Sequence, residues 1–174
     1  IPLWSMAKPV KKPEPTDDRV VENRKARHQY TVTDTLECGI MLKGPEVKSV
    51  RSGLISISEG YVRADAGDTP GSPEPSLVVF GMDIQPYGPA GLRQSNPKRS
   101  RVLLAHKREI IKLARQTSDK GMTLVPLKLY FKNGFAKLLI GVARGKQAHD
   151  KRRAIAEREN KRDLARVMSK RANS

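Results

Sequence analysis

The dipeptide Asn133-Gly134, which stands between two apolar runs, constrains the fold of this chain more than any other feature. Asn-Gly is the strongest short-range signal for a two-residue type I′ hairpin, because both residues tolerate the positive φ angles of that turn. A two-residue turn also fixes which residues of the two strands face each other. The predicted pairs are Lys132 with Phe135, Phe131 with Ala136, Tyr130 with Lys137, Leu129 with Leu138, Leu127 with Ile140 and Val125 with Val142.

The two faces of this hairpin differ in chemistry. One face carries only apolar side chains, whereas the other carries Lys128, Tyr130, Lys137 and Leu139. Pro126 cannot donate to a strand ladder, so we expect a bulge or a barrel corner near it. The hairpin therefore has a core face and an outer face that mixes an aromatic ring with lysines.

A second strand is predicted before the hairpin. Apolar and polar residues alternate over residues 30–42, which is typical of a half-buried strand, and we expect a bend at Asp34. Cys38 falls on the apolar face of this strand as a small buried hydrophobe. Glu37 falls on the outer face, where a solvated carboxylate is the simplest interpretation.

Short elements follow along the chain. Gly44-Pro45 opens a short helix, since proline is tolerated at the first helical position, and Gly53 suits its end. The remaining predictions are strands over 54–64 and 76–84, a Pro- and Gly-rich hairpin tip over 65–75, an irregular link over 85–99, and a helix from Leu103 to about Thr117. Five or six short strands with an interrupting helix predict a mainly β fold, an oligonucleotide-binding-type closed antiparallel barrel with a few short helices.

The charge of the chain is large and uneven. The net charge is +16, and residues 144–174 hold eleven Lys/Arg against four Asp/Glu. Such a basic chain predicts a polyanionic partner, and without a long apolar run nucleic acid is favoured over a membrane. No signal peptide is recognisable, so we expect a cytoplasmic protein.

Composition divides the chain into three parts. Residues 1–21 are expected to be a disordered N-terminal extension, with residues 1–5 foreign to the natural start, and residues 22–146 a barrel domain to which the nucleic-acid binding is assigned. Residues 147–174 form a basic C-terminal tail that has too few apolar residues to dock as a helix. We expect the tail to become helical only on a phosphate-lined surface.

The sequence contains no complete catalytic or metal-binding motif that we recognise. Gly141 to Lys146 resembles a phosphate-binding P-loop but is one residue short, and Gln147 stands where Ser or Thr belongs. The histidines lack metal-ligand spacing, and Cys38 is the single cysteine. We therefore expect neither an enzyme nor a cofactor or metal site. RNA contact is better supported, by the basic cluster over residues 23–28 and by the outer face of the hairpin, although an ordinary solvated sheet face also explains the latter.

Four separated motifs together resemble the SsrA-binding protein family, SmpB, over residues 22–170. They are Asn23 to His28, Gly44 to Ser49, Leu124 to Lys132, and Gly141 to Lys146 followed by His149 to Arg152. The departures from the family pattern are the 65–75 insertion and the N-terminal extension. The resemblance implies a barrel that binds the tRNA-like domain of transfer-messenger RNA and serves trans-translation, the rescue of stalled ribosomes.

The resemblance also implies site residues. The positions that match the family's RNA contact surface are Asn23, Arg24, Lys25, Glu37, Leu104 and Lys137. The predicted RNA-binding set further includes Arg27 from the basic cluster and Lys128 and Tyr130 from the hairpin. The resemblance places His149, Asp150, Lys151 and Arg152 in the ribosomal decoding centre, and Val167 and Met168 belong to the tail that would lie in the empty message channel.

The implied partners are transfer-messenger RNA and the ribosome, with alanyl-tRNA synthetase and elongation factor Tu as indirect partners. An alternative is a structural ribosomal protein, a small barrel with basic arms bound permanently to ribosomal RNA. A third possibility, an RNA-modifying enzyme, would need a cofactor site that the sequence does not offer.

Overall fold

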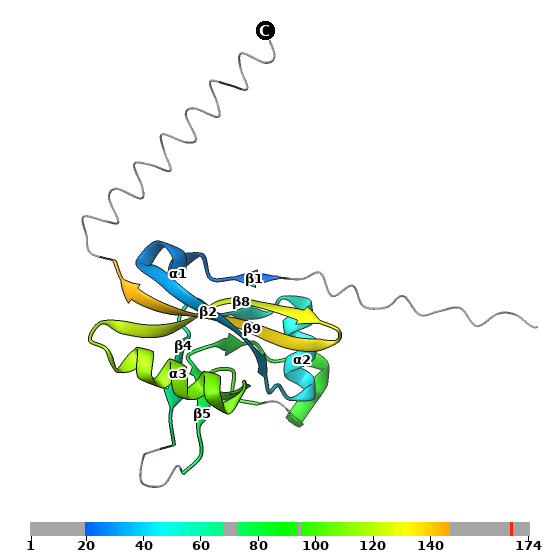
Figure 1. Ribbon diagram of the computed structural model, residues 1–174. Coiled ribbons are helices and arrows are strands. Elements are labelled where there is room, and N and C mark those ends of the chain that lie inside the picture. Colours follow the sequence, from blue (N-terminus) through cyan, green and yellow to red (C-terminus); the bar gives the residue numbers. More distant parts are fainter. Residues whose placement is uncertain (1–19, 68–72, 94, 147–167, 169–174) are drawn as a thin grey trace, which may run out of the picture.

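The computed structural model describes residues 20–67, 73–93, 95–146 and 168 (Figure 1). The strands of this part are β1 (Val21–Glu22), β2 (Tyr30–Ile40), β3 (Ile55–Ser56), β4 (Tyr61–Asp65), β5 (Ser76–Phe80), β6 (Asp83–Ile84), β7 (Arg101–Leu104), β8 (Met122–Lys132) and β9 (Phe135–Gly145). Its helices are α1 (Arg24–Gln29), α2 (Gly44–Ser52), α3 (Lys107–Ser118) and the 3-10 segment Gly88–Arg93. None of the helices in the described ranges is long and apolar enough to cross a membrane.

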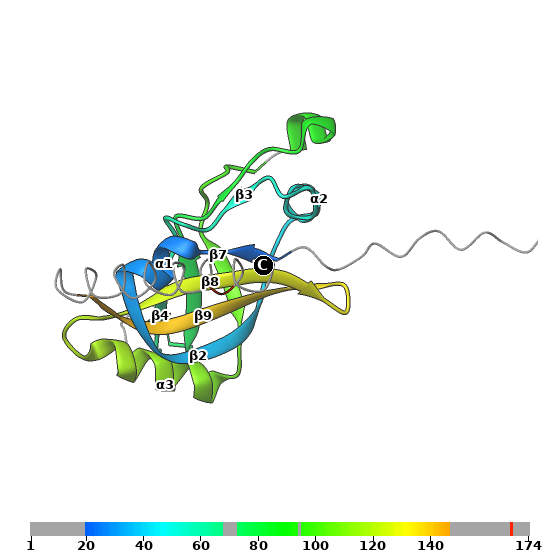
Figure 2. The same cartoon turned by 90° about the horizontal axis from the view of Figure 1, so that it is seen from above.

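Six strands close into a ring. Going round it, β8 pairs with β4, then β5, β7, β2 and β9 follow, and β9 returns to β8; every pairing is antiparallel. The main apolar core includes Leu77, Leu129, Leu138 and Ile140. In both views α1 and α3 lie on opposite sides of the ring (Figures 1 and 2). The prediction of a mainly β, antiparallel fold with a few short helices is confirmed.

The β8–β9 hairpin has the predicted turn. Asn133 and Gly134 both have positive φ angles, 53° and 79°, as a type I′ turn requires. The four predicted pairs nearest the turn, from Lys132–Phe135 to Leu129–Leu138, are observed.

The two predicted pairs farther from the turn are wrong. Leu127 is an extra residue on β8, because the register shifts between Pro126 and Lys128. Ile140 therefore faces Pro126, and Val142 faces Leu124. A proline has no N–H for the ladder, so a bulge beside it is the expected accommodation.

The bulge moves two apolar side chains out of the main core. Val125 and Leu127 pack instead with Ala26 of α1 and Ala143 of β9, in a second buried cluster outside the ring. Asn23 connects the start of α1 to the bulge by two hydrogen bonds. Its backbone N–H donates to the Leu127 carbonyl (2.8 Å). Its side-chain amide donates to the Pro126 carbonyl (3.0 Å).

Several other boundaries differ from prediction. The predicted strand over 54–64 is two short strands, β3 and β4, and the one over 76–84 is β5 and β6. The predicted helix from Leu103 begins only at Lys107, because 101–104 form β7, in which buried and exposed side chains alternate. The capping box of His106 and Glu109 fixes the true helix start. Val21, assigned to the N-terminal extension, pairs with Leu129 in β1.

Other local predictions are confirmed. Gly53 ends α2 in the left-handed region, with φ of 80°. Thr33 is an extra residue on β2, a bulge next to the predicted bend at Asp34. Cys38 is buried, and burial raises the pKa of its thiol to about 12.

A buried ion network ties α2 to the link before β7. Arg101 is 1% exposed, and its guanidinium donates to Glu46 (2.9 and 3.1 Å). Arg99 donates to the same carboxylate at 2.6 and 2.9 Å. Burial would raise the pKa of Glu46, but these hydrogen bonds and the Lys43 backbone N–H outweigh it and lower that pKa. The network also fixes residues 97–99, because Arg101 donates to the carbonyls of Pro97 and Arg99.

We expect Glu46→Gln to lower the free energy of unfolding by about 3–5 kcal/mol, because it leaves the buried Arg101 guanidinium without its counter-charge. Urea unfolding followed by circular dichroism measures the change. Glu59→Gln, which breaks only the exposed ion pair with Lys25 (2.7 Å), is the matched control and should change stability little.

The effect of Glu46→Gln on the free energy of unfolding should depend on pH. Because the folded-state pKa of Glu46 lies below its ordinary value of 4.5, its stabilisation is present above that value and disappears as the pH falls through the folded pKa. The stability difference between the wild type and Glu46→Gln should therefore shrink in acid. A difference that is small at neutral pH, or that does not depend on pH, would contradict this role of Glu46.

Candidate nucleic-acid interface

Four strands bring five of the predicted residues together on one surface. Leu104 of β7 faces Gly39 of β2, Gly39 faces Lys137 of β9, and Lys137 faces Tyr130 of β8. These residues form one row across the sheet. The adjacent row contains Glu37, then Leu139, then Lys128. We call the surface of Glu37, Leu104, Lys128, Tyr130 and Lys137 the outer face, because it lies opposite the core side of the strands.

Gly39 has no side chain, so the row of Leu104, Gly39, Lys137 and Tyr130 has a gap at this position. A Cβ atom at this position would lie 3.3 Å from Cβ of Leu104 and 3.6 Å from its Cδ1. The Leu104 side chain therefore lies over the glycine and is 56% exposed. Sequence analysis did not identify Gly39, since only the register shows what lies beside it.

A hydrogen bond between Tyr130 and Glu37 organises the polar part of the outer face. The Tyr130 hydroxyl donates to the Glu37 carboxylate, and Lys132 forms an ion pair with the same carboxylate (3.6 Å). The hydrogen bond from Tyr130 lowers the pKa of Glu37, with further help from the charges of Lys132 and Lys137. The same hydrogen bond and partial burial raise the pKa of Tyr130 to about 12. Glu37 is therefore an ionised acceptor, and the Tyr130 ring has a fixed position.

The lysines of this region differ in their availability. Lys128 is paired with Glu22 (2.8 Å) and Lys132 with Glu37. Lys137 has no ion-pair partner among residues 20–67, 73–93 and 95–146, and its side chain is half-buried on the outer face. Lys137 is thus the cation best placed to meet a phosphate, whereas Tyr130 and Leu104 offer contact area to a base.

Helix α1 lies on the same side of the sheet, at the other end of the strands. Its Ala26 is buried against Val125, Leu127 and Ala143. Leu139, which lies between Glu37 and Lys128 in the second row, packs on that same cluster. The side chains of Arg24, Lys25 and Arg27 are exposed. The outer face and the basic residues of α1 therefore form one continuous side of the molecule.

Asn23 does not reach this surface. Its side chain is 2% exposed, accepts from the Ala26 backbone N–H (2.9 Å), and donates to the carbonyls of Ile57 (3.1 Å) and Pro126. In this structure the Asn23 side chain positions its neighbours, and its contact with RNA stays a prediction. Asn at a helix N-cap is a recognised sequence signal that would have indicated this.

The predicted tail residues cannot be placed. His149, Asp150, Lys151, Arg152 and Val167 lie outside the described residues. Met168 is described, and its side chain is 70% exposed.

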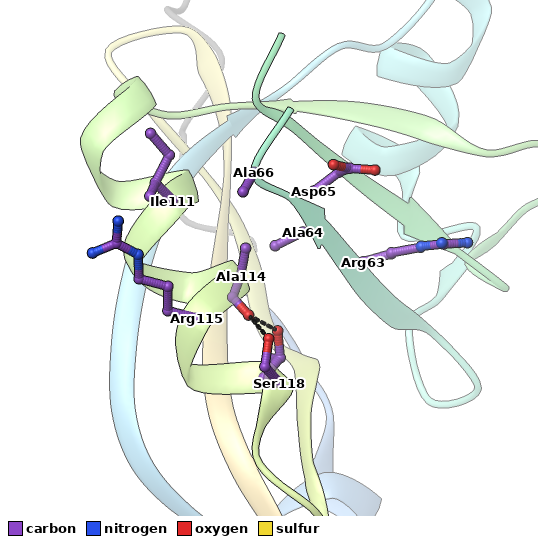
Figure 3. Close-up of a pocket in the computed structure, with 9 residues that line it drawn as sticks. Arg63, Ala64, Asp65, Ala66, Ile111, Ala114, Arg115 and Ser118 are labelled. Carbon is purple, nitrogen blue, oxygen red and sulfur yellow. Dashed lines mark hydrogen bonds between the residues drawn. The ribbon is translucent and has the colours of Figure 1, made fainter. Parts of the chain in front are cut away.

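Another cavity lies between α3 and β4, with a volume of about 470 Å³ (Figure 3). Figure 3 shows that Arg63 and Arg115 on its rim point away from each other, so they do not converge on one anion. The hydroxyls of Thr117 and Ser118 donate to carbonyls of their own helix. This cavity is therefore a poor candidate for a ligand site.

The chain matches a known protein family. A family model described as "SmpB protein" matches residues 20–170. An SsrA-binding protein of Streptococcus pneumoniae (strain P1031) is 46% identical over 149 residues, which cover 86% of this chain and 91% of that protein. An SsrA-binding protein of Staphylococcus aureus (strain Newman) is 47% identical over 152 residues, covering 87% and 94%.

A solved structure is also similar. It is described as "tmRNA-SmpB: a journey to the center of the bacterial ribosome", and one of its chains superimposes with a TM-score of 0.59 at 43% identity. The match covers 74% of this chain and 85% of that chain.

We expect Glu37→Gln to lower the pKa of Tyr130 from about 12 towards the ordinary value of 10, because the hydroxyl loses its ionised acceptor. NMR titration of the Tyr130 ring resonances measures this pKa. Asp34→Asn, which removes a carboxylate that pairs with Lys112 instead, is the control and should leave Tyr130 unchanged. A Tyr130 pKa near 10 in the wild type would refute the hydrogen bond.

Proposed function

The chain belongs to the SmpB protein family, and from this premise we propose that it binds the tRNA-like domain of transfer-messenger RNA and brings it to stalled ribosomes for trans-translation. The observation that carries the proposal is the outer face. Five predicted RNA-binding residues, from four strands, meet in two adjacent rows there. Glu37, Leu104 and Lys137 lie far apart in the sequence, and the pairing of their strands brings them together.

The chemistry of the outer face suits a folded RNA with unpaired bases. Lys137 supplies a charge for phosphate, which gives affinity without sequence choice. Glu37 is an ionised acceptor for amino groups of bases or for ribose hydroxyls, and Tyr130 and Leu104 provide stacking and apolar contact. Arg24, Lys25 and Arg27 extend the positive surface along α1, so that one RNA can contact both ends of the strands.

We further propose that the six-strand ring is an oligonucleotide-binding-type closed barrel. The closed antiparallel pairing and the helix α3 between β7 and β8 support this assignment. Within it, residues 21–146, which include strand β1, act as the RNA-binding domain, residues 1–20 as an extension, and residues 147–174 as the tail.

In this proposal the tail acts on the ribosome. His149, Asp150, Lys151 and Arg152 enter the decoding centre, and the segment with Val167 and Met168 follows the empty message channel, where its positive charge meets phosphates. Alanyl-tRNA synthetase and elongation factor Tu are indirect partners through the RNA. Action on ribosomes also implies a cytoplasmic location.

We expect Lys137→Ala to weaken binding to the tRNA-like domain and to reduce the slope of log K against log salt concentration by about one, because a phosphate contact is lost. Fluorescence anisotropy over a salt series measures both. Arg115→Ala on α3 removes the same charge away from the outer face and should change neither. Equal effects of the two variants would indicate that only net charge matters.

Deleting residues 148–174 should leave affinity for the tRNA-like domain nearly unchanged and abolish tagging of nascent chains on stalled ribosomes, because the tail and the barrel have separate partners. Anisotropy and an in vitro tagging reaction with a truncated message give the two readouts. If the deletion removed RNA binding itself, this division of labour would be wrong.

A further inference from the structure

A second, smaller cavity lies beside α1. It has a volume of about 220 Å³ and opens between α1, the turn before β4 and the first half of β8. The residues that line it include Gln29, Tyr30, Ser58, Glu59, Tyr61 and Thr123. We call it the tyrosine cavity. None of the aromatic and hydroxyl residues in it was predicted to contact RNA.

Asn23 holds the walls of the tyrosine cavity together. Its amide donates to Ile57 in the turn and to Pro126 in β8, while its carbonyl oxygen caps α1. Asn23 itself lies at the cavity and is 2% exposed. One buried side chain thus fixes three segments relative to one another, so the cavity has its shape before a ligand arrives.

The polar groups of the cavity are available. In the described part of the chain, the side chains of Gln29, Ser58 and Thr123 take part in no hydrogen bond. An amide and two hydroxyls supply both donors and acceptors. In the larger cavity under α3, by contrast, the hydroxyls are occupied by their own helix.

Two aromatic residues, Tyr61 and Tyr30, also line the tyrosine cavity. Tyr61 is 53% exposed, and its ring stacks on Phe80 with centroids 5.4 Å apart and planes 17° apart. The stacking holds the Tyr61 ring in place while more than half of the residue remains accessible. Tyr30 provides a second ring in the lining.

The charges lie at the rim. Glu59, the acidic residue of the lining, forms an ion pair with Lys25 of α1 (2.7 Å). The exposed Arg24 and Arg27 belong to the same helix. Phosphates are therefore attracted to α1, whereas the interior suits an uncharged, planar group.

We propose that the tyrosine cavity receives an unpaired nucleobase of the bound RNA, with Tyr61 as the stacking residue and Asn23 as the positioning residue. A cavity of about 150 Å³ can hold benzene, so about 220 Å³ has room for a nitrogen heterocycle. Unpaired bases are recognised by aromatic stacking and by hydrogen bonds to their edges, and the cavity offers both. This inference rests on the proposed function and adds a base-binding subsite distinct from the outer face.

The test is binding of the full-length protein to the tRNA-like domain over a salt series. Tyr61→Ala should weaken binding by about 5- to 150-fold, the range for loss of one base–aromatic stack. Because no phosphate contact is removed, the slope of log K against log salt should not change. Tyr61→Phe, which keeps the ring, should bind nearly as the wild type does. Tyr87→Ala, which truncates an aromatic residue beside Lys48, is the matched control.

The outcomes separate the two proposals. If the wild type binds the tRNA-like domain but Tyr61→Ala binds equally well, the base site is wrong and the proposed function stands. A weakened Tyr61→Ala with a reduced salt slope would mean that α1 has been displaced, and this too would overturn the base site. If the wild type does not prefer the tRNA-like domain over an unrelated RNA of equal length, the proposed function itself fails.

Discussion

The bulge at Leu127 and the Asn23 hydrogen bonds to it are the constraint on which the arrangement of the outer face and α1 depends. Pro126 has no N–H to donate to the β8–β9 ladder, and the register of the two strands shifts beside it. Asn23 donates to the carbonyls of Pro126 and Leu127, and in doing so fixes the start of α1 on the outside of the ring. The positions of Arg24, Lys25 and Arg27, and the shape of the tyrosine cavity, follow from these contacts.

The basic side chains of this molecule fall into two groups, those paired with Glu46 and those at the surface. Arg101, which is buried, and Arg99, which is partly exposed, share the carboxylate of Glu46, and this network orders the link before β7. At the surface, acidic residues pair with particular lysines, such as Glu22 with Lys128, and leave Lys137 open. The acidic side chains therefore determine which lysines of this side of the molecule carry a counter-charge, and Glu37 is a fixed acceptor among them.

The sequence predicts features that depend on neighbouring residues and misses those that depend on distant ones. Asn133-Gly134 specifies its turn locally, so the turn and the pairs beside it were predicted. Pro126 indicated a bulge, but the extra residue and its second cluster depend on α1, which lies a hundred residues away in the sequence. Strand β7 was missed because the buried Arg101 hides its alternation, and only Glu46, from another element, makes that burial possible.

The central claim is that one side of the molecule, from Leu104 and Lys137 to α1, holds the RNA. Hydroxyl-radical footprinting with mass spectrometry, with and without the tRNA-like domain, tests it most directly. The account predicts that RNA protects Leu104, Tyr130 and Tyr61 together, while Ile111 on α3 reacts as it does in the free protein. Protection on α3 with unchanged reactivity at Leu104 and Tyr130 would contradict it.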